Sequence, residues 1–86
     1  MKVKIYGVSF EPIFQQVCEL LKEKNIDYTV DTEFWINPKT LASFQEKTGL
    51  DGLPQTEIDG KFYLGLREVK EYFESQTDSN EKQIKK

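Results

Sequence analysis

Polar and apolar residues alternate at the start of the chain. Residues 2–6 read Lys-Val-Lys-Ile-Tyr, which has the period of two expected of a half-buried strand, and Gly7 marks the exit from that strand. Residues 28–30, Tyr-Thr-Val, are aromatic and β-branched, which favours a second strand. Because a helix is predicted between them, the two strands form a βαβ unit, and a connection of that kind joins parallel strands.

The segment between these two strands has the pattern of an amphipathic helix. Pro12 suits the first helical position, and Glu11 suits the capping position before it. Asn25 can adopt the left-handed conformation that often ends a helix. The predicted apolar face consists of Ile13, Val17, Leu20 and Leu21.

A second helix and a hairpin follow. Asn37-Pro38 repeats the cap-then-proline pattern, and Gly49 ends a short helix that carries Leu41 and Phe44. Two strands, 55–58 and 61–64, are predicted on either side of Asp59-Gly60, a pair favoured in type I′ hairpin turns. These two strands are therefore antiparallel.

The last predicted element is a helix that ends near Gln76. Its apolar side chains recur three and four residues apart, at Leu66, Val69 and Phe73, with Tyr72 beside them. Residues 77–86 are nearly all polar, so we expect them to fray as a disordered tail outside a domain formed by residues 1–76.

The element order β-α-β-α-β-β-α predicts an α/β fold with a four-stranded mixed sheet flanked by three helices. A chain of 86 residues has room for one core only. No apolar run approaches the roughly 20 residues of a membrane-spanning helix, and the N-terminal residues lack the pattern of a signal peptide. We therefore expect no membrane association and a cytoplasmic location.

Composition removes several classes of function. The formal net charge of −3 offers no overall attraction to nucleic-acid phosphates, so no nucleic-acid partner is expected. The single cysteine, Cys18, rules out an intramolecular disulfide. Because the chain has no histidine, a Cys/His metal site and an imidazole base are also ruled out.

Several stretches in this order and spacing resemble the small glutaredoxins of the thioredoxin-fold family. The resemblance runs from Met1 to about Ser75 without an insertion, and each stretch is weak on its own. The matching stretches are Lys2-Val3-Lys4-Ile5-Tyr6, the helix 17–24 with Ile26-Asp27-Tyr28, Lys47-Thr48-Gly49-Leu50, Leu53-Pro54-Gln55 with Ile58-Asp59-Gly60-Lys61, and Glu71-Tyr72-Phe73. The resemblance implies a thioredoxin-like fold.

In that family a Cys-x-x-Cys motif opens the first helix, where the helix dipole favours a reactive thiolate. The four corresponding positions here are Glu11-Pro12-Ile13-Phe14, so the proline is kept and both sulfurs are missing. The resemblance also implies that Pro54 is cis and that the backbone of Leu53 faces the former active site, where the family binds glutathione or a substrate peptide. No catalytic residue is predicted at this site.

The family's glutathione-binding Gly-Gly and acidic pair correspond here to Leu64-Gly65 and Arg67-Glu68. Only Gly65 and Glu68 keep the family's residue types, so the resemblance leaves them as ligand-binding candidates. Leu64 and Arg67 argue against glutathione, and no cofactor is therefore expected.

Three consecutive large apolar residues, Phe34-Trp35-Ile36, break the rule that connecting loops are polar. One interpretation is that they fill the edge of the core. The other is that they join Phe10, Ile13, Phe14 and Leu53 in an exposed apolar surface that binds a partner, because such surfaces usually mark interaction sites. The second interpretation predicts that Trp35 is largely exposed.

The leading functional hypothesis is a redox-inactive glutaredoxin-like module that binds a protein or peptide, either as a monomer or as a weak homodimer. Glu11 either simply complements the helix dipole or presents a negative charge to the partner. The alternative is a glutathione-dependent or monothiol oxidoreductase that uses Cys18 or a partner's thiol. A third possibility is a self-associating structural module, in which the apolar surface is the homodimer interface.

Overall fold

The computed structural model describes the backbone of residues 1–85 and the side chains of residues 1–75. The elements follow the predicted order, with a short 3₁₀ helix, η1, added after the second strand. They are β1 (Val3–Tyr6), α1 (Pro12–Glu23), β2 (Thr29–Asp31), η1 (Phe34–Ile36), α2 (Pro38–Thr48), β3 (Gln55–Ile58), β4 (Lys61–Leu64) and α3 (Gly65–Lys85).

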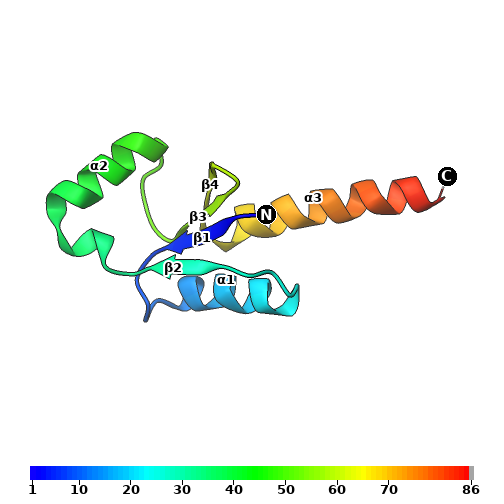
Figure 1. Cartoon of the computed structure of the whole chain (residues 1–86), viewed down its shortest axis with the longest axis horizontal. Helices are drawn as coiled ribbons and strands as arrows, with labels where there is room; N and C mark the ends of the chain where they lie inside the picture. The colour runs from blue at the N-terminus through cyan, green and yellow to red at the C-terminus, as the bar shows by residue number, and fades with distance from the viewer. Residues whose placement is uncertain (86) are drawn as a thin grey trace.

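The four strands form one mixed sheet in the order β2-β1-β3-β4. β1 and β2 are parallel, with Ile5 opposite Val30, as the βαβ unit requires. β3 is antiparallel to both β1 and β4. The parallel pair places the start of α1 and the start of η1 at the same end of the sheet (Figure 1).

Local backbone signals are located where the sequence predicts them. Asn37 caps α2 by accepting hydrogen bonds from the backbone N–H groups of two residues of its first turn. Gly49 ends that helix in the left-handed conformation, with φ of 70°. Both residues of the Asp59-Gly60 turn have positive φ, 49° and 91°, as a type I′ turn requires.

The main core lies between one face of the sheet and helices α1 and α3. The buried stripe of α1 has helical spacing and consists of Phe14, Val17 and Leu21. Ile13, which we placed on the buried face, is 41% exposed. The rest of the core comes from Val3, Ile5, Ile58, Val69 and Phe73.

The opposite face of the sheet carries an aromatic cluster that joins it to η1 and α2. The Tyr6 ring is 5.6 Å from the Phe34 ring and 4.7 Å from the Phe44 ring, and Phe62 on β4 completes the cluster. This cluster fixes η1, and with it the apolar segment 34–36, at the C-terminal end of β1.

The end predicted for the last helix is wrong. α3 continues past Gln76 to Lys85, and its C-terminal part extends away from the sheet (Figure 1). Residues 77–85 contain no Gly or Pro, and Lys, Glu and Gln are good helix formers, so the segment contains no strong helix breaker, although residues 77–80 have low helix propensity. That residues 77–86 form a tail outside the domain stays a prediction.

Candidate functional site

The start of α1 holds no sulfur. Glu11 occupies the N-cap position with extended backbone angles, but its side chain makes no capping hydrogen bond, contrary to our expectation. Pro12 is in the first turn, as predicted. Phe10, just before the helix, is 75% exposed, so this end of α1 presents apolar rather than redox-active side chains.

Phe14 is not part of a surface, and its assignment to the binding surface is wrong. Its side chain is only 6% exposed and belongs to the core. It fills the space next to Gly7, where a Cβ atom would lie 2.7 Å from Phe14 Cδ2 and 3.1 Å from Pro54 Cβ. Phe14 and Pro54 therefore flank the same buried glycine, which ties the start of α1 to the Leu53-Pro54 segment.

The Leu53–Pro54 peptide bond is cis, as the resemblance implies. The Pro54 carbonyl accepts a 2.9 Å hydrogen bond from the Gly65 N–H, which fixes the start of α3 beside it. Leu53 itself is half-buried, and its backbone N–H and C=O make no hydrogen bond to the backbone of residues 1–85 or to the side chains of residues 1–75. Leu53 thus offers one free donor and one free acceptor.

Gln55 holds the loop in front of Leu53, a role that we did not predict. Its side chain is fully buried, and its Nε2 donates to the carbonyls of Leu50, at 3.3 Å, and Gly52, at 3.1 Å. Gln55 Oε1 is buried without a hydrogen-bond partner. No local pattern in the sequence predicts these contacts, because they depend on how the loop folds back over the first residue of β3.

The segment 34–36 combines both interpretations. Phe34 is buried in the aromatic cluster, and Trp35 is only half-buried, with its indole Nε1 buried and without a partner. The prediction that Trp35 is largely exposed is therefore wrong. Ile36, which we named only as part of the run 34–36, is the exposed member at 63%. η1 places Phe34 against Tyr6 and leaves Ile36 exposed, and the exposure of Trp35 lies between the two.

We use the name end surface for Phe10, Ile13, Ile36 and the backbone of Leu53. The exposed fractions of the three side chains are 75%, 41% and 63%. They come from the loop before α1, the first turn of α1 and η1, which all lie at the same end of the sheet (Figure 1).

The two glutathione candidates on α3 are engaged within the protein. Gly65 has φ of 70° and bonds to Pro54. The Glu68 carboxylate accepts a 2.9 Å hydrogen bond from the Leu64 N–H, which satisfies a backbone donor at the start of the helix. The neighbouring Arg67 pairs with Glu71 at 3.2 Å. The ligand-binding role of Gly65 and Glu68 that the resemblance implies stays a prediction.

Cys18 lies one turn beyond Phe14, half-buried and packed against the core. Burial raises the pKa of its thiol, although a hydrogen bond with the Tyr28 hydroxyl and the charge of Lys22 lower it in part. Tyr28 directly precedes β2, so this contact is near the N-terminal end of that strand, whereas the end surface is at the C-terminal end.

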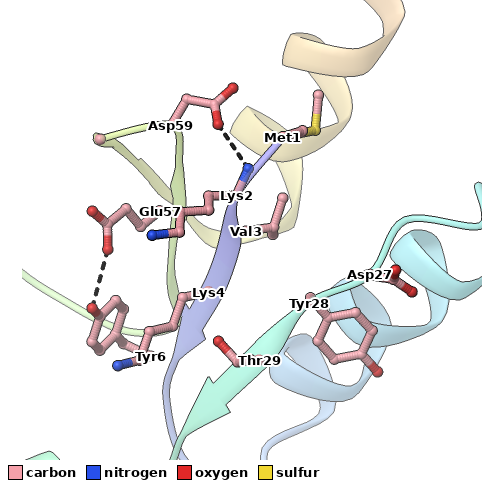
Figure 2. A pocket seen from close by; sticks show the side chains of 11 residues that line it. Met1, Lys2, Val3, Lys4, Tyr6, Asp27, Tyr28, Thr29, Glu57 and Asp59 are labelled. Carbon is pink, nitrogen blue, oxygen red and sulfur yellow. Dashed lines mark hydrogen bonds between the residues drawn. The ribbon is translucent and has the colours of Figure 1, made fainter.

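A separate depression lies on the sheet face that α2 leaves open. It encloses about 790 Å³ and is lined by polar side chains of β1, β3 and their neighbours, including Lys4, Thr29 and Glu57 (Figure 2). Tyr6 donates to Glu57 Oε1 at 3.1 Å. Its lining mixes charges of both signs, without an unpartnered buried polar atom, so we assign no ligand to it.

Two further observations concern the described part of the chain. No group of His, Cys, Asp or Glu side chains there could hold a metal ion. No helix in the same residues is long and apolar enough to cross a membrane.

No protein-family model matches the sequence, and no curated protein matches it. A solved structure is similar: the glutaredoxin from Archaeoglobus fulgidus, which is 25% identical in sequence. The match covers 80% of this chain and 79% of that chain, with a TM-score of 0.65. The two proteins therefore share a fold over most of their length.

Proposed function

We propose that this chain, a glutaredoxin-like protein with a thioredoxin-like fold, is a redox-inactive module that binds an extended segment of a protein or peptide at its end surface. One observation carries the proposal. The free backbone N–H and C=O of Leu53 lie at the same end of the sheet as the exposed Phe10, Ile13 and Ile36.

A free donor and a free acceptor on one residue suit a main-chain ligand. An extended peptide gains affinity from backbone hydrogen bonds and specificity from side chains that contact apolar neighbours. Phe10 supplies the largest anchor, because aromatic side chains often dominate the energy of interfaces. Both kinds of contact are available at the end surface without any change in the core.

The chemistry of the site supports the redox-inactive half of the proposal. The two positions that carry sulfur in glutaredoxins are Glu11 and Phe14, and Phe14 is buried. Cys18 has a raised pKa, so its thiol is mostly protonated at neutral pH and is a poor nucleophile. A single unpaired cysteine fits a reducing compartment, and a cytoplasmic location is part of the proposal.

Glutathione is not the ligand in this proposal. Glutathione carries two carboxylates, and a site for it needs cationic side chains. Arg67 is the cation at the start of α3, and it is paired with Glu71. Glu68, in the same turn, adds a negative charge.

Peptide selection followed by site-directed variants tests the proposal. Peptides are selected from a random phage library on immobilised wild-type protein, and their affinity is measured for the Phe10→Ser/Ile36→Ser variant. We expect at least a tenfold loss, and a change in the backbone amide NMR shift of Leu53 on binding. Val30→Ser is the matched control, because Val30 is 48% exposed on β2 outside the end surface. Equal loss in both variants would contradict the proposed surface.

The oxidoreductase alternative is tested separately. Wild-type protein is assayed with glutathione and a small mixed disulfide, beside the Cys18→Ser variant. We expect both to be indistinguishable from buffer. Turnover by the wild-type protein that disappears in Cys18→Ser would refute redox inactivity.

A further inference from the structure

Charged side chains are unevenly distributed around the end surface. The loops and first helical turns at this end of the sheet contain two cationic residues, Lys39 and Arg67. The same segments, together with the last residue of β2, contain five carboxylates: Glu11, Asp31, Glu33, Asp51 and Glu68.

The carboxylates outnumber the cations and are not neutralised by their own contacts. Arg67 is already paired with Glu71. The partners of Asp31 and Glu68 are backbone N–H groups, which leave the full negative charge in place. Glu33 and Asp51 are exposed, so their charge can act on a bound molecule.

Helix dipoles reduce this charge without reversing it. The N-terminal ends of α1, α2 and α3 all lie at this end of the sheet, and each contributes about half a positive charge. Three such ends offset about one and a half of the three excess carboxylates. The potential around the end surface therefore remains negative.

We infer that the segment bound at the end surface has an apolar centre flanked by lysine or arginine residues. This inference rests on the proposed function and specifies its partner. The apolar centre contacts Phe10, Ile13 and Ile36, and the backbone of one central residue pairs with Leu53. The flanking cations face the carboxylates, in the way that complementary potentials speed association and select partners.

Three synthetic peptides test the inference. Each has the centre Leu-Val-Leu-Val, flanked on both sides by two lysines, two glutamines or two glutamates. Binding is measured by fluorescence anisotropy at about 0.01 M salt, where the Debye length is about 30 Å, and at about 1 M, where it is about 3 Å. We expect the lysine peptide to bind at least tenfold more tightly than the glutamate peptide at low salt, and this ratio to shrink at high salt.

Two double variants, each of which removes two carboxylates, show which negative charges contribute to binding of the lysine peptide. Glu33→Gln/Asp51→Asn removes two carboxylates near the end surface, and we expect it to weaken binding of the lysine peptide about three- to tenfold at low salt. Glu23→Gln/Asp27→Asn removes the same charge from exposed residues near the other end of α1 and β2, and we expect less than a twofold effect.

The outcomes separate the inference from the proposed function. Equal binding of all three peptides, or tightest binding of the glutamate peptide, overturns the inference and leaves peptide binding intact. The same holds if both double variants weaken binding equally. If none of the three peptides binds, and library selection also returns no binder, both the inference and the proposed function fall.

Discussion

Adding one methyl group at Gly7 tests the packing on which the candidate site rests. Gly7 is buried directly after β1, and a Cβ atom there would lie 2.7 Å from Phe14 Cδ2 and 3.1 Å from Pro54 Cβ. Favourable carbon–carbon contacts are about 3.5–4.0 Å. Gly7→Ala therefore displaces the Phe14 ring or the Pro54 segment.

The expected cost follows from two opposing effects. Overpacking a core costs about 1–3 kcal/mol. Because Gly7 does not have a positive φ, alanine can adopt its backbone conformation, and the lower entropy of the unfolded chain returns about 0.4–1 kcal/mol. We expect a net loss of about 0.5–2 kcal/mol in the free energy of unfolding.

Urea unfolding followed by circular dichroism measures this loss. Phe14→Leu is destabilising by itself, because it removes buried carbons, but it also opens space for the new methyl group. The Gly7→Ala/Phe14→Leu protein should therefore be more stable than additivity predicts, by about 0.5–3 kcal/mol. Ser9→Ala, at an exposed neighbour, should stay within about 0.5 kcal/mol of the wild type. A Gly7→Ala protein as stable as the wild type, or strict additivity with Phe14→Leu, would refute this packing.

Three further predictions concern other elements. Asn37→Ala removes the side chain that caps α2 and should cost about 1 kcal/mol in urea unfolding. The pKa of Tyr6 is raised from 10.0 to about 12 by burial, by the hydrogen bond with Glu57 and by nearby negative charge. Its neutral form therefore stabilises the fold fully below pH 10. This contribution to the free energy of unfolding is lost as the pH rises through about 12. In a spectrophotometric titration, the tyrosine that ionises at the highest pH should ionise at a lower pH in the Glu57→Gln variant than in the wild-type protein. Because the pKa of Cys18 is raised, iodoacetamide should alkylate it at pH 7 more slowly than it alkylates a free cysteine peptide, and an equal rate would contradict its burial.

Features that depend on a few neighbouring residues were predictable from the sequence. The Asn37 cap, the left-handed Gly49 and the Asp59-Gly60 turn each follow from the backbone preference of one or two residues. The parallel pairing of β1 and β2 followed from the helix between them. The end of α3 was missed because polarity was taken as a stop signal, although a polar segment without Gly or Pro can continue a helix.

The composition of the end surface was harder to predict, because it depends on which side of each element faces the core. Phe14, Val17 and Leu21 have the helical spacing of three and four, so the buried stripe was readable in the sequence. The burial of Phe34 depends on a contact between residues distant in the chain, which places it against Tyr6. A run of three apolar residues does not show which one remains outside.

Restoring a redox-active cysteine in place of Phe14 would destabilise the fold. The resemblance to glutaredoxins places their second sulfur at the position of Phe14, which contributes to the core and lies against Gly7 and near Pro54. Replacing a buried phenylalanine by a small residue costs about 3–5 kcal/mol, and small domains are stable by only about 5–15 kcal/mol in total. A cysteine at position 14 would therefore remove much of the stability that holds the Leu53-Pro54 segment in place. The ring that excludes the thiol also supports the surface to which we assign peptide binding, so the two halves of the proposed function have the same physical origin.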